Sequence, residues 1–283
     1  MDLAASYYVF LLLSSTRTII HSMDYKTFAL GLAQEAGALI KKNFILRMKK
    51  DWKDGFSPVT ETDRIVNQIV IDDIKKEFPG HGILAEERSD LSGEDEYIWV
   101  CDPVDGTKAF SHGIPTSVFS LALTHKGESL VGVVYDPFMD RMFFAEKGMG
   151  AFLNGEKISV SSNHTIGRSL FGVCSKWKND PYDFSGLSEK IAEESGEIID
   201  VGSIVYMGAL VAVGELAATV FQGTKPWDTA ALKILVEEAG GKVTDLFGNE
   251  QRYDQDIRGH LVSNGLLHDR LLEMLNATIK KPL

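Results

Sequence analysis

Two aspartates carry the strongest chemical signal in the chain. Asp102 and Asp105 stand three residues apart in the run WVCDPVDGTKAF, after an apolar stretch that predicts a strand. Pro103 cannot donate to a sheet ladder, so we expect the chain to leave the strand between them. Gly106 permits close backbone approach and Thr107 adds a hydroxyl. Carboxylates for a hard cation, followed by small anion-binding donors, indicate a metal-assisted phosphate site. An acidic turn is the alternative, but it would explain only one Asp-Gly pair.

Two further acidic motifs flank this run. Glu86 and Glu87 follow a short predicted strand, Gly82 to Ala85, and a Glu-Glu pair is usually a solvated surface feature. Side chains alternate along extended chain, so we expect these two to point to opposite faces. Asp228 precedes an apolar helical pattern, which is also typical of an ordinary N-cap. Neither motif identifies a site by itself.

Taken together, the three motifs resemble the inositol monophosphatase superfamily of magnesium-dependent, lithium-sensitive phosphatases. The family motifs stand here, in the family order, as Glu86-Glu87, Asp102 to Phe110 and Trp227 to Ala230. Further matches are Ser57 to Asp63, preceded by Lys53, and Glu238 to Gly241. The resemblance runs from about Phe28 to about Leu275. It implies a phosphoric monoester hydrolase with a layered α/β/α/β/α sandwich.

The resemblance also implies the metal ligands. It places one Mg²⁺ on Glu86, Asp102 and the backbone carbonyl of Val104, a second on Asp102, Asp105 and Asp228, and a looser third ion on Glu86. Two ions about 3.5–4 Å apart can activate water on one side of a phosphoryl group and stabilise the leaving oxygen on the other. The expected cofactor is therefore two to three Mg²⁺ ions.

The remaining roles are carried over in the same way. Gly106 and Thr107 are expected to donate to the phosphate, and Thr107 with Glu86 to orient the attacking water. Asp63 is expected to accept from the Thr107 hydroxyl. The residues assigned to catalysis are Asp63, Glu86, Asp105 and Thr107, and those assigned to substrate are Gly106, Thr107, Ser203 and Asp228.

Substrate choice is less constrained. Inositol-specific members carry a sugar-binding glutamate seven residues before the Trp-Asp aspartate, and Phe221 stands at that position here. The expected substrate is a small phosphate monoester, with inositol 1-phosphate first and histidinol phosphate second. 3′-Phosphoadenosine-5′-phosphate or fructose 1,6-bisphosphate is the third expected substrate. A silent sugar-phosphate-binding protein is the non-enzymatic alternative. A nucleotide-cofactor fold fails, because Gly148-Met149-Gly150 lacks the third glycine and the following helix.

Composition limits the expected partners and cellular compartment of the protein. A net charge of -11 without a basic run argues against nucleic-acid binding, and bound cations would be needed to attract an anionic substrate. Two cysteines fit a reducing cytoplasm better than a disulfide. No membrane partner is expected, and the resemblance suggests a homodimer.

The organisation along the chain is predicted as three parts. Residues 1–22 are expected to be a translation artefact or a disordered extension; a secretory signal is the alternative, although Asp2 replaces its positive region. Residues 23–158 are expected to form an α+β lobe with most metal ligands, and residues 159–283 an α/β lobe carrying Asp228. A helix from about Thr62 to Lys76 is expected to face Ile65, Ile69, Ile74 and Phe78 inward.

Overall fold

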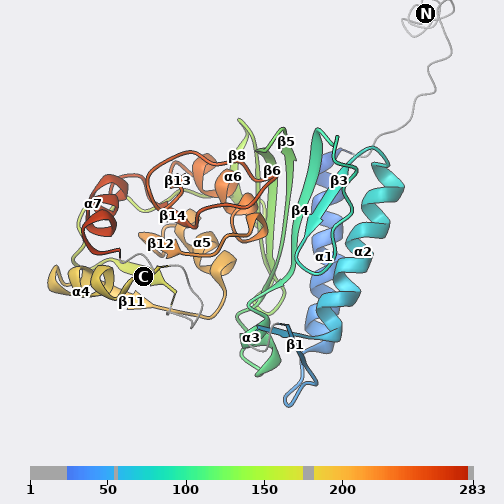
Figure 1. Cartoon of the computed structure of the whole chain (residues 1–283), viewed down its shortest axis with the longest axis horizontal. Coiled ribbons are helices and arrows are strands. Elements are labelled where there is room, and N and C mark those ends of the chain that lie inside the picture. The colour runs from blue at the N-terminus through green and yellow to red at the C-terminus, as the bar shows by residue number, and fades with distance from the viewer. Residues whose placement is uncertain (1–23, 54–56, 175–181, 280–283) are drawn as a thin grey trace, which may run out of the picture.

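The computed structural model describes residues 24–53, 57–174 and 182–279. The expected extension at residues 1–22 lies outside the described residues. Helices and strands are stacked in five alternating layers (Figure 1). From one end to the other, these are a helix pair, a seven-stranded sheet, a second helix pair, a five-stranded sheet and a third helix pair. The layered α/β/α/β/α sandwich expected from the sequence is confirmed.

The first helix pair covers the outer face of the large sheet. It consists of α1 (Tyr25–Asn43) and α2 (Glu61–Glu77). Asp24 caps α1 by accepting from the backbone N–H of Thr27 at 2.7 Å. The short hairpin β1 (Asp51–Lys53) and β2 (Ser57–Val59) joins the two helices. Trp99 is fully buried between these helices and the sheet, and packs against Phe28 and Phe78.

The seven-stranded sheet carries the central acidic motif. Its order is β3-β4-β5-β6-β7-β8-β9, and only the β3–β4 pair is parallel. Its strands are β3 (Gly82–Ala85), β4 (Tyr97–Asp105), β5 (Val118–His125), β6 (Glu128–Asp136), β7 (Arg141–Glu146), β8 (Gly150–Leu153) and β9 (Glu156–Lys157). The Asn154-Gly155 turn joins the last two with positive φ at both residues, the hairpin geometry this dipeptide favours.

The middle helix pair is buried between both sheets. Helices α5 (Ile204–Ala212) and α6 (Ala230–Glu238) contact the large sheet on one side and the smaller sheet on the other. The five-stranded sheet has the order β11-β10-β12-β14-β13, with β10 parallel to both of its neighbours. Its strands are β10 (Leu170–Val173), β11 (Glu197–Ile199), β12 (Ala218–Phe221), β13 (Lys242–Thr244) and β14 (His260–Ser263).

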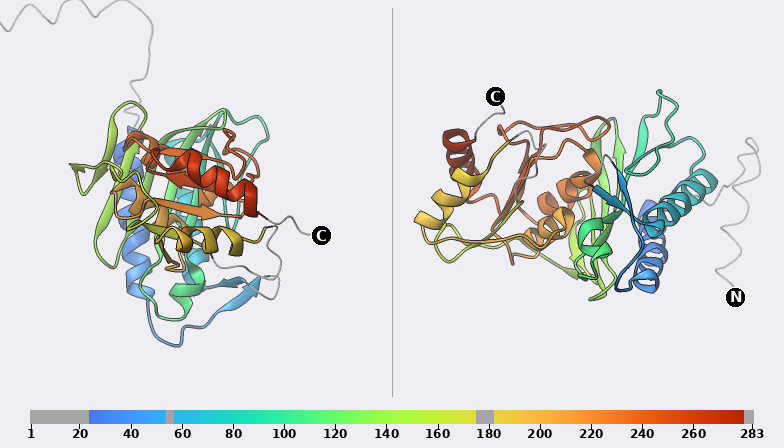
Figure 2. Two further views of the ribbon diagram at one scale, coloured as in Figure 1. Left: turned by 90° about the vertical axis from the view of Figure 1, so that its left-hand side faces the viewer. Right: turned by 60° about the horizontal axis from the view of Figure 1, so that its bottom comes forward.

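The last helix pair closes the far face of the smaller sheet. Helices α4 (Ser185–Glu193) and α7 (His268–Thr278) contact each other there, as the left view of Figure 2 shows. Two short helical segments complete the chain, α3 (Thr107–Ser111) after β4 and η1 (Pro226–Asp228) before α6. Among the described residues, no helix is long and apolar enough to cross a membrane.

Two local predictions are wrong. Strand β4 does not end at Pro103 but continues to Asp105, because its pairing with β5 shifts register between Asp102 and Asp105 and proline is tolerated at such a bulge. Ile65 does not face inward: 37 % of it is exposed, and the buried face of α2 instead includes Thr62, Asp63 and Val66. The polar residues of that face belong to the site described next.

Candidate metal centre

Three aspartates converge where the large sheet meets the middle helices. Asp102 and Asp105 come from the end of β4, and Asp228 comes from η1. One carboxylate oxygen of each lies within 4.8 Å of those of the other two. Asp102 and Asp105 are buried, with 3 % and 5 % exposed, and Asp228 is partly exposed. The bulge in β4 is what allows two residues of one strand, three apart, to share a site.

The crowded negative charge has electrostatic consequences. Burial, then repulsion from Glu86, Asp105, Asp228 and Asp63, raises the pKa of Asp102 well above its ordinary value. Burial raises the pKa of Asp105 to about 6, although hydrogen bonds from Ser203 and Val205 oppose the rise. Burial and the charges of Asp105 and Glu86 likewise raise the pKa of Asp228, which Lys225 partly offsets. Without a cation, this arrangement disfavours full ionisation.

The donor set fits a hard divalent cation. Among the described residues, the cluster contains carboxylates only, without histidine or cysteine. Oxygen-only donors suit Mg²⁺, Ca²⁺ or Mn²⁺ rather than zinc or copper. Burying several carboxylates together is costly unless a positive charge joins them. The residues present therefore fit a bound divalent ion.

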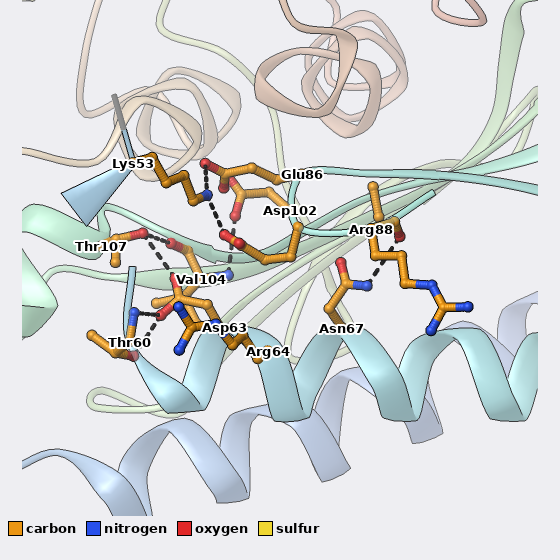
Figure 3. Close-up of polar contacts among 12 residues, drawn as sticks. Lys53, Thr60, Asp63, Arg64, Asn67, Glu86, Arg88, Asp102, Val104 and Thr107 are labelled. Atoms are coloured by element: carbon orange, nitrogen blue, oxygen red, sulfur yellow. Dashed lines mark hydrogen bonds and ion pairs between the residues drawn. The ribbon is translucent and has the colours of Figure 1, made fainter. Parts of the chain in front are cut away.

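Glu86 lies at the margin of this cluster. Its Oε1 is 3.0 Å from Lys53 Nζ (Figure 3). The same ammonium group contacts Glu87. The prediction that the two glutamates point to opposite faces is therefore wrong: strand geometry ends at Ala85, so side-chain alternation does not apply beyond it. The structure does not bring Glu86 into the group of three converging aspartates, although its charge raises the pKa of all three.

Asp63 and the partly exposed Thr107 form a hydrogen-bonded pair beside the cluster (Figure 3). Thr107 Oγ1 lies 3.0 Å from Asp63 Oδ1 and 3.0 Å from the Val104 carbonyl oxygen, so its single proton serves one acceptor at a time. Asp63 is fully buried at the start of α2, where its other oxygen accepts from the Thr60 backbone N–H at 2.9 Å. Burial raises the pKa of Asp63, and the threonine hydrogen bonds oppose this rise. The capping box of α2 thus fixes a carboxylate next to the Thr107 hydroxyl.

Gly106 sits where any side chain would be both strained and crowded. Its φ is +82°, and a Cβ there would lie 2.9 Å from the carbonyl oxygen of Gly202 and 3.0 Å from the Cβ of Ser203. Its own carbonyl oxygen accepts from Ser117 Oγ at 2.9 Å. The backbone between Asp105 and Thr107 is therefore packed directly against the segment that starts α5.

Ser203, which the resemblance assigns to the substrate, makes two hydrogen bonds within the protein. Its hydroxyl donates to Asp105 Oδ2 and accepts from the Tyr206 backbone N–H at 3.2 Å. The Val205 backbone N–H donates to the same Asp105 oxygen at 3.0 Å. No local sequence signal could reveal the two contacts with Asp105, because about a hundred positions separate the partners.

Comparison with known proteins identifies the family of this chain. The Inositol monophosphatase family matches residues 23–280. The chain belongs to the inositol monophosphatase family. It is an enzyme of the phosphoric monoester hydrolase class.

Individual relatives support the assignment. The chain is 34 % identical to a fructose-1,6-bisphosphatase/inositol-1-monophosphatase of Thermotoga maritima, over 92 % of this chain and 98 % of that protein. It is 33 % identical to an inositol-1-monophosphatase of Mesorhizobium japonicum, over 89 % and 94 %. It is also 32 % identical to the Nus factor SuhB of Escherichia coli, over 83 % and 89 %.

Solved structures show the same fold. An IMPase from Thermotoga maritima superposes with a TM-score of 0.81 at 35 % identity, covering 90 % of this chain and 98 % of that one. An inositol monophosphatase from Anabaena gives 0.79 at 30 % identity, covering 89 % and 95 %.

Proposed function

We propose that the protein hydrolyses a small polyol or sugar phosphate monoester, inositol 1-phosphate foremost, with two to three Mg²⁺ ions. The observation that carries the proposal is the convergence of Asp102, Asp105 and Asp228 within 4.8 Å. The bound ions would supply a positive field for the phosphate and a nucleophile of lowered pKa. Asp102, Asp105 and Asp228 would hold them, with Glu86 and the Val104 carbonyl at the edge of the site.

Side chains and backbone groups of the protein would bind the phosphate and orient the attacking water. Phosphoryl transfer depends mostly on positioning and electrostatic stabilisation. The backbone N–H groups of Gly106 and Thr107 would donate to the phosphate oxygens. Thr107 Oγ1 would orient the attacking water with Glu86, while Asp63, 3.0 Å from that hydroxyl, would hold its proton. Displacing Lys53 from Glu86 would free that carboxylate for the same task.

A bisphosphate substrate is the second candidate. The Thermotoga maritima relative is named for both fructose 1,6-bisphosphate and inositol 1-phosphate. Phe221, whose ring lies 5.5 Å from that of His260, replaces the glutamate expected of an inositol-specific enzyme. Because Phe221 replaces that glutamate, histidinol phosphate and 3′-phosphoadenosine-5′-phosphate also remain candidate substrates.

The test is a phosphatase panel with purified full-length protein. Release of inorganic phosphate would be measured with inositol 1-phosphate, histidinol phosphate, adenosine 3′,5′-bisphosphate and fructose 1,6-bisphosphate, in Mg²⁺ and again in excess EDTA. We expect turnover only with Mg²⁺ and the highest kcat/KM for inositol 1-phosphate. Undiminished turnover in EDTA would refute the metal mechanism. Substrate binding without turnover would favour the silent binding protein.

The proposal also covers the cellular compartment, the oligomeric state and the division of the chain into lobes. We place the enzyme in the cytoplasm as a homodimer, working as two lobes, residues 23–158 and 159–283. The burial of Cys101 as a thiol in β4 supports a reducing compartment. Light scattering of the purified protein tests the dimer, because a monomer mass at micromolar concentration would contradict it.

A further inference from the structure

The N-terminus of α5 is hydrogen-bonded to the carboxylate of Asp105 in the metal centre. Ser203 caps this helix, and its hydroxyl donates to Asp105 Oδ2. The backbone N–H of Val205 donates to the same oxygen at 3.0 Å. Ser203 is 1 % exposed and Asp105 5 %. Both donors and their acceptor are thus withdrawn from solvent, where such bonds are stronger than in water.

The two bonds fix which oxygen faces the site. A carboxylate rotates freely unless its oxygens are held, and here Oδ2 receives two donors from the same helix end. The positive end of the helix dipole also favours the charged form at this place. Both hydrogen bonds act to lower the pKa of Asp105, against the effect of burial. Oδ1 is therefore the oxygen available to a cation, in one orientation.

The start of α5 is itself held in register against the large sheet. Tyr206 accepts a hydrogen bond from Arg141 Nη1 at 2.6 Å. Just before the helix, the Val201 carbonyl oxygen accepts from Thr116 Oγ1 at 2.8 Å. The tight contact between Gly106 and Gly202 lies between these two points. The donors on Asp105 are therefore anchored from both sides.

We propose that Ser203 is a positioning residue that sets metal affinity by orienting Asp105, not a substrate-binding residue. The inference rests on the proposed function, because it takes Asp105 as a metal ligand. Partners that orient metal ligands typically contribute 10–100-fold to metal affinity. Ser203 lies on the middle helix layer rather than on the strand that carries the ligand. The site is therefore completed only when that layer is docked.

Calorimetric titration of the full-length, chelator-treated protein with Mg²⁺ and Mn²⁺ tests this directly. Ser203→Gly removes the hydroxyl but keeps an acceptable N-cap, which costs only a few tenths of a kcal/mol. We expect metal binding about 10–100-fold weaker in this variant. Ser203→Thr, which keeps the hydroxyl, is expected to restore it. Thr116→Val removes a neighbouring hydrogen bond but leaves both donors on Asp105 in place, and is expected to weaken metal binding far less than Ser203→Gly does.

Kinetics separate positioning from substrate contact. At saturating Mg²⁺, Ser203→Gly is expected to keep the substrate KM of the wild type. When Mg²⁺ is varied at saturating substrate, the variant is expected to need about 10–100-fold more Mg²⁺ for half-maximal activity. Unchanged metal affinity in Ser203→Gly, or a raised KM alone, would overturn the inference. An equal loss in Thr116→Val would assign the effect to general docking and overturn it as well. If the wild type binds no divalent ion, the proposed function fails rather than this inference alone.

Discussion

We expect Asp105→Asn to change the stability and the activity of this protein in opposite directions. Oδ2 of Asp105 already accepts from Ser203 and Val205. An asparagine must therefore place its carbonyl oxygen at that position to avoid opposing the Val205 N–H. Its NH₂ group then occupies the place of Oδ1 and presents two donors to the cation site. We expect kcat to fall more than about 100-fold, because a ligand is lost and a donor replaces it.

The metal-free protein should gain stability from the same change. The pKa of Asp105 is about 6 in the fold against an ordinary 3.8. A raised acidic pKa means that the folded state binds more protons between these values, so stability falls as the pH rises through this window. Each pKa unit corresponds to about 1.4 kcal/mol, so ionised Asp105 costs the fold about 3 kcal/mol above pH 6. Removing the charge should raise the melting temperature in EDTA at pH 8 by roughly 5–10 °C.

Thermal unfolding followed by circular dichroism measures both effects. Wild type and variant would be compared at pH 8 in EDTA and in saturating Mg²⁺, and again at pH 4, where the gain should vanish. Mg²⁺ at 100 times its Kd should stabilise the wild type by about 2.7 kcal/mol and the variant far less. Asp72→Asn, which removes an exposed aspartate, controls for the change in net charge. A variant no more stable than the wild type in EDTA would refute the charge-crowding argument, and near-normal kcat would refute the ligand assignment.

Three other outcomes are expected. Gly106→Ala should lower the free energy of unfolding by about 2–4 kcal/mol in urea, because it combines positive φ with close contacts to Gly202 and Ser203. The stability that neutral, buried His268 contributes should be lost as acid is added between pH 6.5 and 4, opposite in sign to the effect of Asp105, because burial lowers the pKa of His268 to about 4 and the unfolded chain binds the extra proton. This loss is about 3 kcal/mol in urea titrations. Li⁺ should inhibit phosphate release uncompetitively or noncompetitively, because a monovalent ion on the three aspartates supplies half the charge.

Each of these has a matched control. Gly93→Ala has a similar φ of +89° with nothing within 4 Å of the added Cβ, so an equal loss there would show that crowding at Gly106 is unimportant. His268→Gln should lose less stability in acid than the wild type by this amount, and an unchanged pH profile would contradict the assignment to His268. Indifference to Li⁺ at matched ionic strength, while Asp228→Asn abolishes activity, would leave the metal centre standing and remove the inhibition claim.

The sequence predicts most strands and helices because their patterns are strong. The apolar run before Asp102 and the short run Gly82 to Ala85 both form strands, as predicted. In helix α2, Ile74 and Phe78 are buried as predicted, but Ile65 is not, because the polar residues Asp63 and Asn67 take buried positions near the start of the helix. A functional helix buries polar residues, and a hydrophobic pattern cannot show this.

The site is only partly predictable from the sequence, because several of its contacts join segments that are far apart in the chain. The Asp102 and Asp105 motif is local, and the resemblance brings Asp228 to it across more than a hundred residues. The contacts of Ser203 and Val205 with Asp105, and of Lys53 with both glutamates, depend on how layers dock. Spacing along the chain contains no information about which hydroxyl meets which carboxylate.

The burial of the middle helix layer between two sheets also bears on how the chain must be made. The inner face of the large sheet, including Val100, Ala122, Val134 and Phe143, is covered by side chains of α5 and α6. On the ribosome, the seven strands emerge before either of those helices has been synthesised. The nascent chain therefore exposes a broad apolar sheet face until residues 204–238 follow. That interval is when such a chain is most exposed to aggregation and most dependent on chaperones.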